Sequence, residues 1–225
     1  MKQLCFLFAL LMVANNAPAV ILFEDSFDSG PSDNWTMFYD WYWADGRMYS
    51  DIGHKDNALG GGELGCSNYI MSLDVMPTGT NQEFAFVLFS QRDPAVAFDT
   101  YPGDCLTGYV FHIHTGTPGL VYEVNCSGAW QDYLGDWSIL TPLVVTHVQC
   151  GQLGENLVYR HWQEGNPVPD WQYSRPHTTG WHQGYWYIFN RDNAPGTWID
   201  NVRIEGEGVV NTEVSSWGSV KALFQ

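Results

Sequence analysis

The chain has 225 residues, of which 16% are aromatic and 15% are charged, and this composition excludes intrinsic disorder, which requires few aromatic residues and many charges. Asp and Glu number 25 against 9 Lys and Arg, so the formal net charge is −16. Such a surface repels phosphate backbones, and we expect no nucleic-acid partner. It suits divalent cations and neutral ligands, although solubility alone is a sufficient reason for an acidic secreted protein.

The N-terminus has the pattern of a signal peptide. Lys2 supplies a positive charge, residues 4–13 form an apolar run too short to span a bilayer, and Ala17-Pro18-Ala19 offers small residues for cleavage after Ala19. A buried N-terminal helix is the alternative, but no amphipathic period supports it. We therefore expect residues 1–19 to direct export to the extracellular space or cell envelope, with no membrane span further along the chain.

Four cysteines follow this segment, and an even number in an exported chain predicts two disulfides. Three pairings are compatible with the sequence, and no CxxC pair indicates a zinc or redox site. These cysteines are Cys66, Cys105, Cys126 and Cys150.

Short β-rich runs separated by Gly, Pro, Asn and Asp clusters dominate the remaining sequence, and helical periodicity is almost absent. Ten or so strands without helices predict an antiparallel sandwich or barrel within one domain, residues 20–208. The expected strands lie near residues 21–27, 47–50, 69–76, 84–90, 108–114, 120–125, 143–149, 157–163, 185–190 and 198–205.

Alternation within the run 108–114 predicts which face is buried. Tyr109, Phe111 and Ile113 should pack between the sheets, while His112 and His114 should point toward solvent or a ligand. Within 185–190 the alternation is ambiguous. Either the face that carries Trp186 or the face that carries its aromatic neighbours could be the exposed one.

Several segments resemble the concanavalin-like and laminin-G-like jelly-roll superfamily. They are Leu22-Phe23-Glu24-Asp25-Ser26-Phe27 with Trp35, then Ala44-Asp45-Gly46-Arg47-Met48, then Trp162-Gln163-Glu164-Gly165 with Pro169-Asp170-Trp171, and finally Trp198-Ile199-Asp200-Asn201-Val202-Arg203-Ile204. The resemblance implies an all-β, antiparallel two-sheet β-sandwich of the concanavalin-like jelly-roll type. It does not specify the ligand, because this fold hosts lectins, glucanases and adhesion modules alike.

Residues 209–225 form a separate C-terminal tail. Its segment 217–224 resembles the short Trp-Gly-x-x-Lys-x-Leu-aromatic ends of some exported bacterial proteins. Packing of this tail against the sandwich is the alternative.

No local catalytic motif occurs in the sequence. The Glu-x-Asp-x-x-Glu strand of family-16 glycoside hydrolases is missing, as are Gly-x-Ser-x-Gly and His-Glu-x-x-His patterns. Carboxylates from separate strands could still converge, so a glycan-active hydrolase on the same fold is the alternative to a binding module. A purely structural envelope protein is the third possibility.

His112 and His114 share one strand face and could ligate a transition metal together with His147 or His161. The favoured interpretation is that the two histidines are polar residues hydrogen-bonded to neighbours or water, because no supporting carboxylate can be placed from sequence.

A structural calcium ion joining the first and last strands is implied by the family resemblance. Its expected ligands are Glu24 or Asp25, Asp200 and a carbonyl near Gly46.

Exposed indoles can stack against sugar rings, and Asp, Asn or His can then bind the hydroxyl groups. The sequence thus predicts a secreted carbohydrate-binding or adhesion-like module, stabilised by Ca²⁺, whose partner is a glycan or cell-surface polysaccharide. Partial burial is the competing fate of each Trp. The candidate ligand-binding residues are His112, His114, Trp186, Trp41, Trp43 and Trp130.

Overall fold

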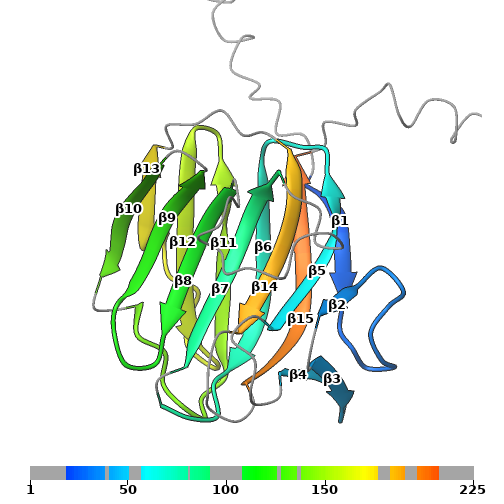
Figure 1. Cartoon of the computed structure of the whole chain (residues 1–225). Helices are drawn as coiled ribbons and strands as arrows, with labels where there is room; N and C mark the ends of the chain where they lie inside the picture. The colour runs from blue at the N-terminus through cyan, green and yellow to red at the C-terminus, as the bar shows by residue number, and fades with distance from the viewer. Residues whose placement is uncertain are drawn as a thin grey trace, which may run out of the picture.

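The computed structural model describes residues 19–38, 41–50, 57–80, 82–91, 108–125, 128–135, 138–176, 183–190 and 197–207. Residues 1–18 of the expected signal peptide, the tail from residue 209 onward, and both Cys105 and Cys126 lie outside these ranges. Within them the chain forms two antiparallel sheets packed face to face, as Figure 1 shows, and no α-helix. The expected all-β, two-sheet sandwich is confirmed.

One sheet has eight strands and the other has seven. The eight-stranded sheet runs in the order β13 (Tyr173–Pro176), β12 (Asn156–Gln163), β11 (Thr146–Leu153), β6 (Tyr69–Met76), β15 (Thr197–Glu207), β4 (Arg47–Ser50) and β3 (Trp41–Ala44), with β1 (Ala19–Asp25) also paired to β15. The seven-stranded sheet runs in the order β10 (Gly128–Gly135), β9 (Gly119–Asn125), β8 (Gly108–His114), β7 (Glu83–Ser90), β14 (Gly184–Asn190), β5 (Asn57–Leu64) and β2 (Thr36–Phe38).

The two sheets differ in how their outer faces are covered. Along β6 buried and half-buried residues alternate, which is the pattern of a strand with one face on the core and one face toward water. Along β7 every residue after Glu83 is buried, and along β8 every residue before His114 is buried. The central strands of the seven-stranded sheet are therefore shielded on both faces.

An aromatic cluster fills one end of the core. The ring of Phe23 lies 4.8 Å from that of Trp35 and 4.9 Å from that of Trp186, and the two indoles are 5.2 Å apart. Gly61 of β5 makes room for this cluster, since a Cβ there would lie 2.1 Å from the Trp186 ring. Trp186 is 1% exposed, so it belongs to the core and does not form the ligand floor considered for it from sequence.

The turn after β1 is held by the buried carboxylate of Asp25. One oxygen accepts the backbone N–H of Phe27 at 2.8 Å, and the other accepts the N–H of Ser32 at 2.8 Å and the indole N–H of Trp35 at 2.7 Å. Phe27 has a φ of 55°, an unusual conformation for a bulky residue, and its carbonyl accepts the indole N–H of Trp43 at 2.7 Å. Asp25 thus ties the end of the first strand to the aromatic cluster.

Cys66 and Cys150 are free thiols in the hydrophobic core, and this finding corrects the prediction of two disulfides. Cys150 lies on β11 opposite Met71 and Tyr159, and Cys66 lies in the segment after β5. Both sulfurs pack as small apolar groups, which is the usual environment of a structural cysteine. Burial also raises the pKa of each thiol, so the reactive thiolate is disfavoured.

We expect iodoacetamide to leave Cys66 and Cys150 unmodified in the folded protein at pH 8, because the thiols are buried and protonated. In denaturant without reductant, both should become modified, as peptide mass spectrometry would report. Modification of either residue only after reduction would show that it is held in a disulfide.

Replacement of Asp25 by Ala should lower the free energy of unfolding by about 3 kcal/mol, because three donors, two of them buried, lose a charged acceptor. Urea denaturation measures the change. Asp28→Ala is the matched control on the same turn: its exposed carboxylate accepts the Ser26 hydroxyl at 2.8 Å, and its loss should cost no more than about 0.5 kcal/mol. Equal effects of the two substitutions would refute the anchoring role of Asp25.

Candidate functional site

Two histidines and a glutamate converge on the outer face of the seven-stranded sheet. His112 and His114 lie on β8, and Glu83 lies on the neighbouring strand β7, directly opposite His114. Ala85 is opposite His112, so the small side chain at this position leaves space beside the imidazole. Because side chains alternate along a strand, Glu83, His112 and His114 all project from the same face. We refer to these three residues as the His–Glu cluster.

The ligand atoms of the His–Glu cluster are close together. Nε2 of His112 lies 3.4 Å from Oε2 of Glu83, and Nδ1 of His114 lies 3.7 Å from Oε1 of the same carboxylate. The two imidazole rings have centroids 4.2 Å apart. One ligand atom from each residue can be chosen so that the three atoms lie within 4.8 Å of one another. The side chain of His112 is 8% exposed, whereas those of His114 and Glu83 are 13% and 28% exposed.

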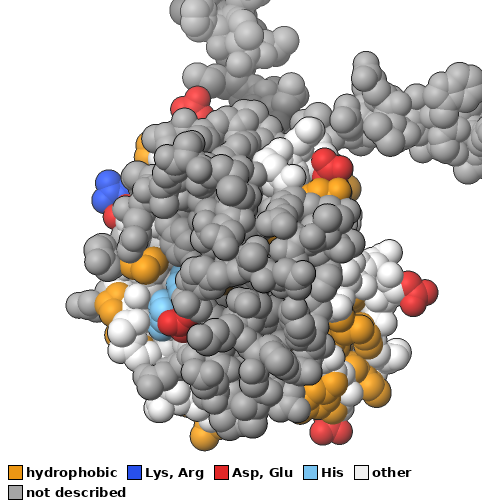
Figure 2. Space-filling model, in the orientation of Figure 1, with side chains coloured by type: hydrophobic (Ala, Val, Ile, Leu, Met, Phe, Trp, Pro, Cys, Tyr) orange, Lys and Arg blue, Asp and Glu red, His pale blue; other side chains and the backbone are white. Residues whose placement is uncertain are grey.

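Figure 2 shows histidine and acidic side chains side by side on the face that the seven-stranded sheet presents to the viewer. The cluster is therefore partly shielded and yet reaches the surface.

The backbone around the cluster is fixed by hydrogen bonds beyond the β7–β8 ladder. Gln82 and Thr115 are joined twice, through the Thr115 N–H to the Gln82 carbonyl at 3.1 Å and through the Gln82 N–H to the Thr115 hydroxyl at 2.9 Å. The Thr197 hydroxyl donates to the Gln82 side chain at 2.9 Å, and the carbonyl of His114 accepts the N–H of Leu140 at 2.7 Å. These bonds hold both strand ends that carry the cluster.

The structure agrees with the alternation expected for β8 and adds a residue that the sequence did not indicate. Tyr109, Phe111 and Ile113 belong to the core between the sheets, and His112 and His114 lie on the opposite face. That face is not open as expected, because His112 is buried. Glu83 is the carboxylate that could not be placed from sequence. It is 31 positions from His114 in the chain, and the antiparallel pairing of β7 with β8 brings the two residues together.

His147 and His161, the expected partners of these histidines, lie elsewhere. They belong to β11 and β12 of the eight-stranded sheet. His147 contacts the carboxylate of Asp74 through Nδ1, and His161 lies beside the Tyr159 hydroxyl at 3.3 Å. Burial lowers the pKa of His161. Neither residue joins the His–Glu cluster.

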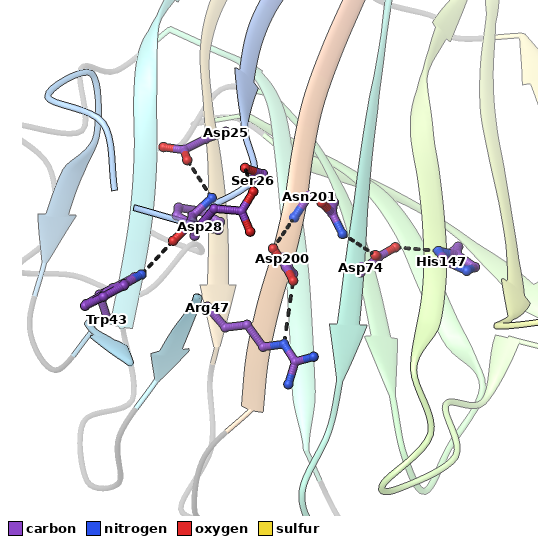
Figure 3. A network of polar contacts seen from close by, with 10 residues as sticks. Asp25, Ser26, Asp28, Trp43, Arg47, Asp74, His147, Asp200 and Asn201 are labelled. Atoms are coloured by element: carbon purple, nitrogen blue, oxygen red, sulfur yellow. Dashed lines mark hydrogen bonds and ion pairs between the residues drawn. The ribbon is translucent and has the colours of Figure 1, made fainter. Parts of the chain in front are cut away.

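A polar network covers part of the outer face of the eight-stranded sheet (Figure 3). Asp74 accepts the side-chain N–H of Asn201 at 2.8 Å and contacts His147, and Asp200 accepts the backbone N–H of Asn201 at 2.8 Å. Asp200 also lies 3.6 Å from the guanidinium of Arg47. Burial raises the pKa of Asp200, while the Asn201 N–H and Arg47 act in the opposite direction. The contacts of this network hold the two carboxylates in place.

The residues expected to bind calcium have separate contacts in the structure. The carboxylate of Asp25 accepts three hydrogen bonds, Glu24 pairs with Arg203 at 3.0 Å, and Asp200 pairs with Arg47. Gly46 occupies the turn between β3 and β4 with a φ of 74°. In the described part of the chain, the group of His, Cys, Asp or Glu residues with the geometry to hold a metal ion is the His–Glu cluster.

The candidate tryptophans also lie in different environments. Trp41 is buried, at 6% exposure, whereas Trp43 is 45% exposed on the same strand, β3. Beside it Tyr42 stacks on Tyr49 of β4, with ring centroids 5.5 Å apart. Trp130 lies on β10, but its side chain is outside the described set. Three candidate indoles have described side chains, those of Trp41, Trp43 and Trp186. Among these three, only the indole of Trp43 is accessible for stacking.

Comparisons with known proteins concern the fold. Neither a protein-family model nor a curated protein sequence matches the chain. In the described part of the chain, no helix has the length and apolar character that crossing a membrane requires.

Solved structures resemble it at low sequence identity. Carbohydrate-binding module CBM66 from Bacillus subtilis has a TM-score of 0.54 at 12% identity, over 77% of this chain and 96% of that chain. The VIP36 exoplasmic/lumenal domain, in a form bound to Ca²⁺ and Man2, has a TM-score of 0.57 at 11% identity, over 83% and 87% of the two chains. A xylan β-1,4-xylosidase from Bacillus halodurans has a TM-score of 0.56 at 11% identity, over 80% of this chain and 38% of the enzyme. These similarities, together with the two antiparallel sheets, show that the chain has the concanavalin-like jelly-roll fold.

Proposed function

We propose that the chain is an exported carbohydrate-binding or adhesion-like module that binds a glycan on the outer face of its seven-stranded sheet. The observation that carries the proposal is the convergence of Glu83, His112 and His114 on two central strands of that sheet. Small-ligand sites typically combine apolar walls with a few polar groups held in fixed positions. The His–Glu cluster supplies those polar groups, and buried neighbours on β7 and β8 supply the apolar surroundings.

The chemistry of the cluster suits sugar hydroxyls. A carboxylate can accept several hydrogen bonds, and a neutral imidazole offers one donor and one acceptor. Adjacent hydroxyl groups of a sugar both donate and accept, so they can bond to Glu83 and His114 together. His112, which is almost buried, would act mainly by orienting Glu83.

The structural neighbours are consistent with this function. CBM66 is a carbohydrate-binding module, and VIP36 was solved with Ca²⁺ and Man2 bound. The proposal does not require calcium in this chain, because Glu24, Asp25 and Asp200 each contact protein donors. A structural calcium ion is a separate proposal, which melting with added calcium and with chelator tests.

A glycan-active hydrolase is the alternative, and a xylosidase is among the structural neighbours. Hydrolysis needs two carboxyl groups on either side of one bond, about 5–10 Å apart. Asp74 and Asp200 lie opposite each other on β6 and β15, but Asn201, His147 and Arg47 hold them in the polar network. The contacts of this pair favour a structural role over catalysis.

The test is retention of a glycan by the secreted chain on an array of plant, bacterial and animal glycans. For the retained glycan, Glu83→Gln and His114→Ala should each weaken binding at least about tenfold, because each removes a hydrogen bond of roughly 1.5–3 kcal/mol to a charged or polar group. Melting temperatures of the variants should stay close to that of the wild type, since both side chains reach the surface.

Trp43→Ala is the matched control, because Trp43 is exposed on the β3–β4 hairpin and not in the cluster. It should bind the glycan like the wild type. If Trp43→Ala loses binding while the cluster variants keep it, the glycan lies on the hairpin. If the wild type retains no glycan, carbohydrate binding itself is refuted.

A further inference from the structure

We propose that Glu83, His112 and His114 bind one divalent transition-metal ion, with Zn²⁺ as the best-fitting ion. The inference uses the same three residues as the proposed glycan site, but it does not depend on glycan binding, since Zn²⁺ titration is measured without a glycan. Two imidazole nitrogens and a carboxylate oxygen are a common ligand set for Zn²⁺. Three protein ligands leave a fourth position of a tetrahedral ion for water or another small ligand.

The distances within the cluster suit coordination better than direct hydrogen bonding. Bonds of 2.0–2.1 Å in a tetrahedral zinc site place neighbouring ligand atoms about 3.3 Å apart. The two nitrogen–oxygen distances in the cluster are 3.4 Å and 3.7 Å. Both exceed the roughly 2.7–3.2 Å of a normal hydrogen bond between nitrogen and oxygen. These two distances end on different oxygens of the Glu83 carboxylate, and one ligand atom from each of the three residues can be chosen so that the three lie within 4.8 Å of one another. Small side-chain rotations would bring these atoms to coordination distance.

The surroundings of the cluster favour a defined site. Glu83 and His114 are registered opposite each other on paired strands, and the doubly bonded pair Gln82 and Thr115 fixes the adjacent backbone. His112 is held on the same strand as His114, two positions away, with its ring 4.2 Å from that of its neighbour. A site on rigid strands loses little conformational entropy when an ion binds. The carboxylate also offsets part of the charge of the ion.

The ligand set discriminates against calcium. Ca²⁺ prefers six to eight oxygen ligands at 2.3–2.6 Å, and the cluster offers two nitrogens. Imidazole ligands suit zinc, copper, nickel and related ions. The proposed site is thus separate, in position and in chemistry, from the calcium site expected between the first and last strands.

His147 provides a control within the same molecule. It also contacts a carboxylate, that of Asp74, but its ring lies 5.2 Å from the Trp162 ring and Asp74 is shared with Asn201. Among the described residues, no third His, Cys, Asp or Glu completes a metal set at this pair. A histidine–carboxylate contact alone should therefore not bind the ion.

Isothermal titration of the chelator-stripped full chain with Zn²⁺ tests the proposal, and Co²⁺ absorption reports the coordination. The wild type should bind Zn²⁺ at a site that is lost in the variants. Glu83→Gln, which keeps the shape of the side chain, and His114→Ala should each weaken that site at least about a hundredfold, because even residues that only support a ligand contribute ten- to a hundredfold. His147→Gln should bind like the wild type.

Calcium in excess should not displace Zn²⁺ from the wild type. Melting curves of each variant without metal show whether it is folded, and Glu83→Gln tests the site if His114→Ala unfolds. Equal Zn²⁺ affinity in the wild type and Glu83→Gln would overturn the proposal. Loss of binding in His147→Gln, or displacement of the ion by calcium, would overturn the assigned position or the assigned class of metal.

Discussion

Burial of one face of the β7–β8 pair between the sheets fixes the positions of Glu83, His112 and His114 on its other face. Phe84 and Phe86 on β7, and Phe111 and Ile113 on β8, are 0–1% exposed in the core. Because side chains alternate with a period of two, a slip of one residue would bring histidine into the core and phenylalanine to the surface. The cost of that exchange enforces the register. The His–Glu cluster is therefore a consequence of hydrophobic packing on the opposite face.

The same constraint acts at the other end of the core through the aromatic cluster of Phe23, Trp35 and Trp186. Each of these rings comes from a different part of the chain, and Gly61 gives them space. The Asp25 carboxylate satisfies the indole N–H of Trp35, so a buried donor is paired and the turn after β1 is held. An aspartate near the first strand can thus serve packing, although the family resemblance suggested an ion ligand.

Much of the fold could be predicted from local patterns. The ten expected strands all have counterparts, because alternating apolar residues and turn residues are local signals. The five strands that were not expected have weaker signals: β5 contains Gly60, Gly61 and Gly62, β10 begins and ends with glycine, and β2, β3 and β13 are short. The order of strands in the sheets could not be predicted, since it depends on contacts between distant segments. Glu83 was missed as a partner of His114 for that reason.

Side-chain environment was harder to predict where both faces of a strand are apolar. On β14 the neighbours Trp186, Tyr187 and Ile188 are all buried, so alternation gave no signal for which residue faces the core. The cysteines present a related difficulty. An even number of cysteines in an exported chain favours disulfides. Cys66 and Cys150 nevertheless have the low exposure of core residues and are free thiols.

The two outer faces use similar residue types for different purposes because their geometry differs. On the eight-stranded sheet, Asp74 and Asp200 lie directly opposite each other, and Asn201, Arg47 and His147 compensate the repulsion between like charges. On the seven-stranded sheet, one carboxylate faces two imidazoles at distances longer than hydrogen bonds. Imidazole is a metal ligand and a hydrogen-bonding partner when neutral, whereas a guanidinium is always charged and is not a metal ligand. The two imidazoles beside Glu83 are therefore what makes this face suited to an ion or a neutral ligand.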